Sequence, residues 1–487
     1  MARVRGTRAS EDAAHRVALA WMRVRVAVVG GLLGAGLLVL LGRAVDLQVV
    51  QHDRLAQMAR DQTLRKVEVQ APRARIEDRN GEALALSVDV DSVAVDPSRL
   101  KDRSATARAL ASILEVDART LEARLARGRY FTWVRRRVSP AQAEAVRGLG
   151  LPGVFLVREA RRFYPHRELA AQVLGFVGID GNGLEGLELS LDSVLRGERT
   201  SALALRDAHG RRLLQDDPFG EPEVGPGKVR LTLDRTIQWI TERALLRAVR
   251  SSRARAGMAV VLEPTTGAVL ALASVPTYNP NRPGDAERRA RRNRPLTDVY
   301  EPGSTFKVFT LGAALEAGQV TPDTPIECEG GAWKVAGRVI HDSHPHTRLT
   351  VTEVLTKSSN IGAAKIAAAL GRDRLADTLE AAGFGHRTGL RLPGEQSGIL
   401  HRRDRIGPVE LATLAFGQGI AVTPIQLASA ISAVANGGVR MKPYLVARIE
   451  HPDGSVEVTR PRVAGRVFSA RTAAMLTRMM ETVTRPG

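Results

Sequence analysis

An uncharged apolar run near the amino end constrains the fold of this chain more than any other feature. Residues 26–42, VAVVGGLLGAGLLVLLG, carry no charge and lie between Arg25 and Arg43. The run is at the short end of the length that crosses a bilayer as a helix. Because the Arg43 side chain can snorkel toward the headgroups, the apolar stretch can extend through residue 45. We therefore expect a transmembrane helix over residues 26–45.

The charges around this run predict its orientation. Six arginines precede it, against the two acidic residues Glu11 and Asp12. The positive-inside rule then makes residues 1–25 a cytoplasmic tail and places the body on the opposite side of the cytoplasmic membrane. A cleaved signal peptide is the alternative, but it needs a shorter apolar core than this run. No second run of this length occurs, so we expect a single-pass protein with a periplasmic or otherwise extracytoplasmic body.

Composition excludes several classes of function. Lys plus Arg number 71 and Asp plus Glu 52, a net charge of +19, but only 8 of the 71 are lysine. So strong an arginine bias is typical of codon composition, and the aromatic residues that stack on bases make up only 4%. We therefore expect a solvated basic surface rather than a nucleic-acid partner. The single cysteine, Cys328, excludes an intrachain disulfide framework and a cysteine-based zinc site.

A linker divides the body into two parts. Residues 216–228, DDPFGEPEVGPGK, contain three prolines and three glycines, which is typical of a connecting segment. Before the linker, residues 50–215 mix strand patterns with helical spacing over 103–149, and they predict an elongated α+β domain. After it, residues 229–487 begin with a strand, an amphipathic helix over 235–251 and a β-hairpin, which predict a larger α/β domain.

The most informative segment is Glu301–Phe309, EPGSTFKVF. Its Pro-Gly pair predicts a turn before an apolar helix, with Ser304 in the first turn of that helix and Lys307 one turn further on. Residues at this spacing share a helix face, which brings the amine within reach of the hydroxyl. A buried lysine with a lowered pKa can remove the hydroxyl proton, whereas an arginine cannot. The pair therefore predicts a serine nucleophile with a lysine base.

The Ser-x-x-Lys spacing is weak evidence by itself, because it also occurs at Ser98 and Lys101. That copy follows Asp96-Pro97 at the start of a polar helix. We expect Ser98 to be only the N-cap of that helix.

A second motif supports Ser304. Lys357-Ser358-Ser359-Asn360 opens another apolar helical stretch. Acyl transfer needs a group that returns a proton to the leaving amine and a group that orients the substrate amide. The hydroxyl of Ser358 and the carboxamide of Asn360 suit these two roles.

Together these motifs resemble those of penicillin-binding proteins and class A β-lactamases. The longer stretches Arg294–Lys307 and Phe416–Pro424 resemble the class B penicillin-binding proteins, and within them the division-specific peptidoglycan D,D-transpeptidase (penicillin-binding protein 3 type). The resemblance runs from the anchor to about residue 440. Upstream it rests on segments similar to the family's non-catalytic region, at residues 71–73, 78–81, 84–87, 164–165, 175–178 and 186–188.

The resemblance implies a fold and a reaction. The fold is α/β: a penicillin-recognising serine transpeptidase domain (β-lactamase-like), preceded by an elongated α+β pedestal of dimerisation type and one transmembrane helix. Ser304 would attack the D-Ala–D-Ala carbonyl of a stem peptide, with Lys307 as base, Ser358 as proton relay and Asn360 as a substrate contact. β-Lactams would acylate Ser304 instead, and neither a metal nor a cofactor is needed. The implied partners in septal wall synthesis are peptidoglycan stem peptides, the membrane, a membrane-embedded glycan polymerase and other division proteins.

Two departures from the family pattern matter. Arg73-Ala74 stands where the family has Arg-Gly, which is important only if the backbone freedom of glycine is needed. The third family box, Lys-Thr-Gly or Lys-Ser-Gly, is absent. Arg387-Thr388-Gly389 is similar, but it precedes residues 416–424, whereas the box follows that stretch, so we expect an ordinary turn there. The sequence ends at residue 487, short of the expected box, and we expect a truncated chain that is inactive as a transpeptidase.

Other functions stay open on the sequence. An elongation-type transpeptidase has the same domains and motifs. A D,D-carboxypeptidase or a β-lactamase shares the catalytic fold, but the long anchored region before that fold argues against both. A β-lactam-binding sensor is expected to have several membrane spans, and a catalytically inactive division scaffold is the remaining alternative.

Overall fold

The computed structural model describes residues 5–52, 54–55, 64–69, 72–128, 130–196, 200–205 and 227–484. Of the linker expected over residues 216–228, only Gly227 and Lys228 fall within the described residues. Contacts within the chain group it into two compact units, residues 1–69 with 200–221 and residues 70–199 with 222–487.

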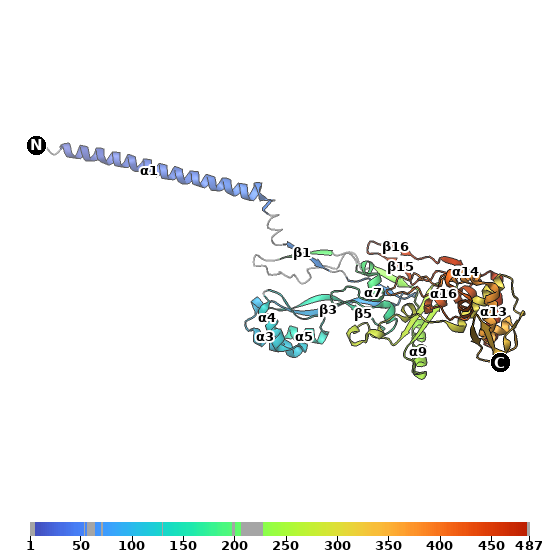
Figure 1. Cartoon of the computed structure of the whole chain (residues 1–487). Coiled ribbons are helices and arrows are strands. Elements are labelled where there is room, and N and C mark those ends of the chain that lie inside the picture. The colour runs from blue at the N-terminus through green and yellow to red at the C-terminus, as the bar shows by residue number, and fades with distance from the viewer. Residues whose placement is uncertain are drawn as a thin grey trace. The chain divides into compact units, whose positions relative to one another are not determined.

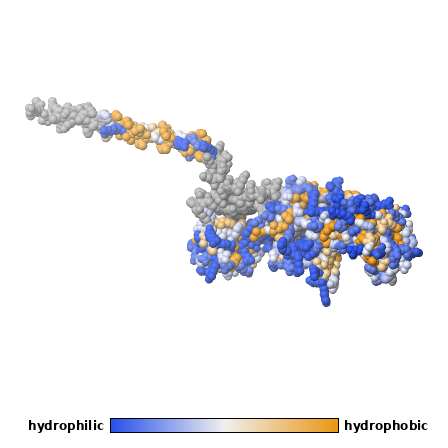
Figure 2. Space-filling model, in the orientation of Figure 1, coloured by the Kyte–Doolittle hydropathy of each residue, from blue (hydrophilic) through white to orange (hydrophobic). Residues whose placement is uncertain are grey.

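One long helix dominates the first unit. Helix α1 (Arg5–Val45) continues into a short π-helix, η1 (Asp46–Val50). The part from Trp21 to Val50 is long and apolar enough to cross a membrane, and Figure 2 shows its hydrophobic surface. The apolar helix therefore contains the predicted span 26–45 and extends beyond both ends of it. The unit also holds an antiparallel pair of strands, β1 (Leu64–Val69) and β6 (Thr200–Leu205).

A long antiparallel ladder forms the amino-terminal part of the second unit, the pedestal (Figure 1). Strand β3 (Ala83–Val95) pairs with β5 (Val154–Phe163) from Leu86 to Val95. Three helices share an apolar core with Val93 and Val95 at the end of β3. These helices are α3 (Arg103–Leu114), α4 (Ala118–Arg127) and α5 (Pro140–Gly148).

The expectation of helices throughout residues 103–149 was wrong at one place. Thr132–Arg135 form a strand, β4, which pairs antiparallel with the end of β3. Aromatic and β-branched residues, here Trp133 and Val134, favour a strand. Val134 joins the core of the three helices, so tertiary packing fixes this short segment between two helical patterns.

The sheet continues from the pedestal into the larger domain. Strand β2 (Arg75–Glu77) pairs with β3 on one side and, in parallel, with β7 (Lys228–Leu231) on the other. β7 then pairs with β15 (Val446–Glu450), and β15 pairs with the edge strand β16 (Val456–Val458). Residues of both domains share one apolar core, so the pedestal and the larger domain belong to one compact unit.

A helix and a hairpin open the larger domain, as the sequence predicted. Helix α9 (Arg235–Ser251) packs on the hairpin of β8 (Gly257–Leu262) and β9 (Val269–Val275). Helix α16 (Pro424–Ala435) also contacts β8. Every residue of β8 is partly exposed, and within the described ranges this hairpin has no third strand.

Helix α11 (Lys307–Glu316) runs through the centre of a helical cluster. Its residues from Lys307 to Leu315 are all buried. The rings of Phe306, Phe309 and Phe384 pack together, with centroids 5.1 to 5.4 Å apart. A helix that is buried all round is typical of the core of a large domain. The surrounding helices are α12 (Val351–Thr356), α13 (Asn360–Leu370), α14 (Arg372–Ala381), α15 (Pro408–Leu414) and α17 (Ala470–Val483).

Short elements make up the remaining connections. The short helices are α6 (Ala171–Leu174), α7 (Gly186–Ser190), α8 (Asp192–Leu195) and α10 (Arg294–Thr297). Short antiparallel strand pairs join β10 (Pro325–Glu327) to β13 (Arg348–Thr350), β11 (Ala332–Val335) to β12 (Arg338–His341), and β14 (Val439–Met441) to β17 (Val463–Arg466).

Candidate active site

Ser304 lies at the surface, just before the buried helix α11. Gly303–Phe306 form a 3-10 turn, η5, that runs directly into α11 at Lys307. Side chains three residues apart eclipse one another in a 3-10 turn, and Nζ of Lys307 is 3.1 Å from Oγ of Ser304. Ser304 is exposed, whereas Lys307 is only 1% exposed. The pair expected from the sequence thus combines an accessible hydroxyl with a buried amine.

The loop that contains Gly417 and Gly419 packs against this turn. The Gly303 N–H donates to the carbonyl oxygen of Gly417 over 3.1 Å. Gly417 has a φ of +78°, and a Cβ atom on it would lie 2.3 Å from the Gly303 carbonyl oxygen. Only glycine permits so close an approach. Beside it the Gly419 N–H donates to Glu301, so the two long stretches that carry the family resemblance lie against each other.

Ser358 completes a triangle of polar atoms with Ser304 and Lys307. It follows α12 in a left-handed conformation with a φ of +57°, which is uncommon for residues other than glycine and often occurs at functional sites. Its hydroxyl donates to Oγ of Ser304 over 2.8 Å, and Nζ of Lys307 donates to it over 2.9 Å. A continuous path of hydrogen bonds therefore joins the two hydroxyls and the amine.

The amine of Lys307 has four oxygen acceptors around it. Two are the hydroxyls of Ser304 and Ser358, and the others are the Ser358 carbonyl at 2.6 Å and Oδ1 of Asn360 at 2.9 Å. Burial lowers the pKa of Lys307 to about 8, against an opposing, smaller effect of the Asp342 carboxylate. An amine with this pKa is partly neutral near neutral pH, as a general base must be.

The carboxamide of Asn360 is held at both ends. Its Oδ1 accepts from Lys307, and its Nδ2 donates to the carbonyl of His341 over 3.0 Å. An amide nitrogen carries two hydrogens, so one N–H is left for a further acceptor. The structure thus brings all four residues expected from the sequence, Ser304, Lys307, Ser358 and Asn360, into one site.

Asp342 is a site residue that the sequence analysis missed. Its Oδ1 accepts from the backbone N–H groups of Asn360 and Ile361, and its Oδ2 accepts from the hydroxyl of Ser359. These bonds fix the first turn of α13 and therefore the position of Asn360. Asp342 belongs to no recognisable motif and directly follows β12, so only its place in the fold identifies it.

The second Ser-x-x-Lys sequence lies in the pedestal. Ser98 belongs to a 3-10 turn, η2 (Pro97–Arg99), and the Asp96 carboxylate accepts from both the N–H and the hydroxyl of Ser98. The prediction that Ser98 is the N-cap was wrong, because Asp96 is the cap. Aspartate is a favoured N-cap residue, and proline is favoured at the first position after the cap, so Asp96-Pro97 places the cap at Asp96.

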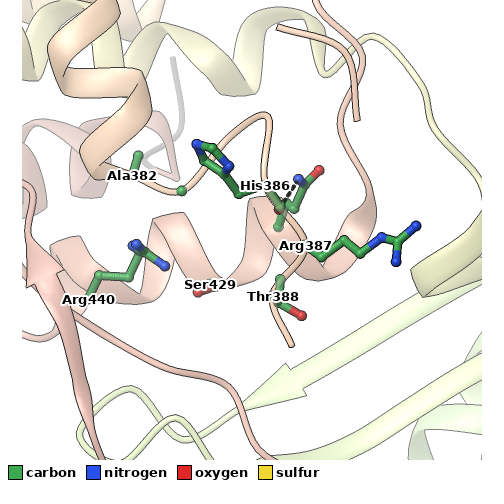
Figure 3. A pocket seen from close by; sticks show the side chains of 8 residues that line it. Ala382, His386, Arg387, Thr388, Ser429 and Arg440 are labelled. Atoms are coloured by element: carbon green, nitrogen blue, oxygen red, sulfur yellow. Dashed lines mark hydrogen bonds between the residues drawn. The ribbon is translucent and has the colours of Figure 1, made fainter. Parts of the chain in front are cut away.

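Arg387-Thr388-Gly389 has a carboxylate partner of its own, Glu395. The N–H and the hydroxyl of Thr388 both donate to Oε1 of Glu395. Thr388 also lines a small cavity together with Ser429 and Arg440 (Figure 3). Within the part of the chain that the structure describes, this segment makes no hydrogen bond to Ser304 or Lys307.

The arrangement suits acyl transfer. An exposed hydroxyl, a buried amine of lowered pKa and a second hydroxyl lie within 3.1 Å of one another, at the amino end of a helix whose dipole favours negative charge. Among the described side chains, no group of three His, Cys, Asp or Glu residues is placed to hold a metal ion.

Two protein-family models match most of the chain. The penicillin-binding protein dimerisation domain matches residues 68–226. The penicillin binding protein transpeptidase domain matches residues 257–487. The order of the two models is the order of the pedestal and the larger domain.

Individual proteins agree with these models. The chain is 35% identical over 452 residues to the probable peptidoglycan D,D-transpeptidase PenA of Neisseria meningitidis serogroup A, across 92% of this chain and 76% of that protein. It is 34% identical over 482 residues to the peptidoglycan D,D-transpeptidase FtsI of Escherichia coli K12, across 97% and 79%. Its structure is similar to the crystal structure of penicillin binding protein 3 from Mycobacterium tuberculosis with aztreonam, with a TM-score of 0.64, 29% identity and coverage of 86% and 76%.

Proposed function

This chain belongs to the class B penicillin-binding proteins, a family of serine-type peptidoglycan D,D-transpeptidases, and we propose that it cross-links the cell wall at the division septum. The same matches confirm the predicted fold, a transpeptidase domain preceded by a pedestal domain, with an apolar helix near the amino end. The observation that carries the proposed reaction is the triangle of hydrogen bonds among Ser304, Lys307 and Ser358.

In the proposed reaction the neutral amine of Lys307 takes the proton of the Ser304 hydroxyl as Oγ attacks the D-Ala–D-Ala carbonyl of a stem peptide. The oxyanion that forms is stabilised by the Ser304 backbone N–H, which lies in a first helical turn where N–H groups lack intrahelical acceptors. As the amide bond breaks, Ser358 passes the proton to the departing D-Ala amine. An amine of a neighbouring stem then attacks the acyl-enzyme and restores the Ser304 hydroxyl.

Asn360 and Asp342 have supporting roles in this proposal. The remaining N–H of Asn360 is available to a backbone carbonyl of the substrate. Asp342 acts through Asn360, because its hydrogen bonds hold the first turn of α13. It is therefore a positioning residue that does not touch the substrate.

β-Lactams would enter the same reaction as substrate mimics. Oγ of Ser304 would open the ring amide and form an acyl-enzyme. The structurally similar penicillin binding protein 3 has been crystallised with aztreonam and with ampicillin. Labelling by a fluorescent penicillin is therefore the natural test of the proposed nucleophile.

The third family box bears on whether residues 1–487 act by themselves. These residues contain no Lys-Thr-Gly or Lys-Ser-Gly sequence. The resemblance implies that the box supplies a carboxylate anchor and a second oxyanion donor from a strand beside the site. Removal of one oxyanion donor alone costs about 10²–10³ in rate. We therefore propose that residues 1–487 alone are inactive as a transpeptidase and acylate penicillin very slowly or not at all.

The matched experiment compares residues 1–487 with a version that continues through a Lys-Thr-Gly strand. The acylation rate is measured for both with one β-lactam. A much faster reaction of the longer version supports the proposal. Equal rates would mean that the box is dispensable or that Arg387-Thr388-Gly389 replaces it.

We place the amino-terminal tail in the cytoplasm and the catalytic domain outside. The support is the apolar helix over Trp21–Val50 and the six arginines that precede the uncharged run. A reporter that works only outside the cytoplasm should be active when fused after about residue 60. A mature chain that begins near residue 45 would show a cleaved signal peptide instead.

The septal role is supported by the likeness to FtsI and PenA. It implies a membrane-embedded glycan polymerase and other division proteins as partners. A fluorescent fusion should gather at midcell, and depletion of the protein should block division. A lateral distribution with loss of rod shape would favour the elongation-type alternative, and full division with a Ser304→Ala protein would favour an inactive scaffold.

A further inference from the structure

A groove of about 470 Å³ lies where the pedestal meets the larger domain. The pedestal contributes Leu187 and Leu191, at and just after helix α7. The larger domain contributes β15, β16 and the loop around Leu390. None of the residues that line the groove belongs to the Ser304 site, so the groove has no place in the proposed reaction.

The rim of this groove carries an excess of positive charge. Arg391, Lys442, Arg460 and Arg462 line it, and all four are exposed. Within the described ranges, none of these side chains forms a hydrogen bond or an ion pair. The single acidic residue in the lining, Glu457, is already bonded to Nε2 of His451. Four cations around one hollow favour an occupant that carries several carboxylates.

The wall of the groove is apolar. Leu191, Val446 and Ile449 line it and are only partly buried, packed on the core that the two domains share, and Val458 of the edge strand is 60% exposed. A small oxyanion would leave this apolar surface in water. An occupant with alternating acidic and apolar side chains satisfies both the rim and the wall.

The edge strand β16 adds a reason to expect an extended chain. Glu457 of β16 lies opposite Ile449 of β15. Two residues further along in each direction, the N–H of Thr459 donates to Ala447 and the N–H of His451 donates to Ser455. Because hydrogen-bonded and non-hydrogen-bonded pairs alternate in an antiparallel ladder, Glu457 and Ile449 are a hydrogen-bonded pair and Val458 is not bonded to β15. The backbone groups of Val458 therefore point away from β15, and no further strand pairs with β16 in the described part of the chain. A free edge of this kind can accept another strand.

We propose that this groove binds an extended acidic segment of a partner protein, in which carboxylate and apolar side chains alternate. The carboxylates pair with Arg391, Lys442, Arg460 and Arg462. The apolar side chains lie against Val458 and the partly exposed Leu191, Val446 and Ile449 of the wall. Because the groove is lined by both the pedestal and the transpeptidase domain, one bound segment contacts both. The proposal is independent of the chemistry at Ser304.

The test measures binding of a labelled peptide that alternates glutamate and leucine to the full chain in detergent, by fluorescence anisotropy. The test variant is Lys442→Glu/Arg460→Glu/Arg462→Glu. Its matched control is Arg374→Glu/Arg471→Glu/Arg478→Glu, three exposed arginines of α14 and α17 outside the groove. We expect binding that falls as salt rises. The test variant should bind at least about tenfold more weakly, from the loss of three exposed ion pairs, while the control variant binds like the parent.

Two further measurements keep the test decisive. A peptide with glutamine in place of glutamate should not bind, and Val458→Thr should weaken binding of the glutamate peptide. If the charge-reversed variant does not fold, Arg460→Gln/Arg462→Gln takes its place. The proposal is overturned if parent and test variant bind the peptide equally, if neither binds it, or if only anionic lipid vesicles bind in a groove-dependent way.

Discussion

The amine of Lys307 lies 3.1 Å from the hydroxyl oxygen of Ser304, yet the lysine is 1% exposed and the serine is open to solvent. The proposed base and the proposed nucleophile therefore lie in different surroundings. Burial keeps the amine partly neutral, and exposure leaves the hydroxyl accessible to a substrate. The 3-10 turn η5 produces the contrast, because it stacks residue 304 directly over the first residue of the buried helix α11.

Lys307→Arg should abolish labelling by a fluorescent penicillin. A guanidinium stays charged and cannot take the hydroxyl proton. The measurement uses the version that continues through a Lys-Thr-Gly strand, and Lys101→Arg is the matched control because it alters the pedestal copy of the Ser-x-x-Lys spacing. Labelling of the Lys307→Arg protein at the parent rate would remove the lysine from the mechanism.

The acylation rate should rise with pH and level off above about 8. Only neutral Lys307 is a base, and a pKa of about 8 leaves about one amine in ten neutral at pH 7. Below the pKa the rate should therefore rise about tenfold per pH unit. A rate that stays constant or falls between pH 6 and pH 8 contradicts the assigned base.

Asp342→Asn should move the midpoint of the rise of the acylation rate with pH to a lower pH. The Asp342 carboxylate raises the pKa of Lys307, and a carboxamide removes the charge while its oxygen can still accept the N–H groups of α13. Asp342→Ala should in addition lower the stability by about 1 kcal/mol, as loss of a helix cap does. Asp373→Asn, an exposed acid in the first turn of α14, should change neither property.

Gly417→Ala should destabilise the protein and slow acylation. Both Gly417 and Gly419 have left-handed backbones, so alanine costs about 1–2 kcal/mol at either position. At Gly417 the added Cβ would also lie 2.3 Å from the Gly303 carbonyl oxygen, whereas at Gly419 its nearest neighbour is 3.6 Å away. Gly419→Ala is thus the matched control. Equal melting temperatures and equal acylation rates would show that the contact behind Ser304 has no role.

The sequence predicts the features that depend on local spacing. The apolar run, the helix over 235–251, the hairpin after it and the Ser304–Lys307 pair each follow from a pattern within a few residues. The closeness of Ser358 to Ser304 does not follow from spacing, because 54 positions separate them. It came from the resemblance to a family whose motifs meet in space.

What the sequence does not predict depends on contacts between distant segments. Trp133 and Val134 favour a strand locally, but the helical patterns on both sides obscure that signal, and only pairing with β3 and packing on three helices fix β4 as a strand. Asp342 acts on the first turn of α13 from a position that carries no motif. The pairing of β1 with β6 joins residues 64–69 to 200–205, and no local pattern in either segment specifies that partner.

Covalent labelling by a fluorescent penicillin tests most directly whether Ser304 is the nucleophile. The version that continues through a Lys-Thr-Gly strand is labelled, digested and examined by mass spectrometry, beside its Ser304→Ala and Ser98→Ala variants. If Ser304 is the nucleophile, the adduct lies on the peptide that contains Ser304, it is lost in Ser304→Ala, and Ser98→Ala is labelled as strongly as the parent protein. Undiminished labelling of the Ser304→Ala protein, or an adduct on any other residue, would contradict this assignment of the nucleophile.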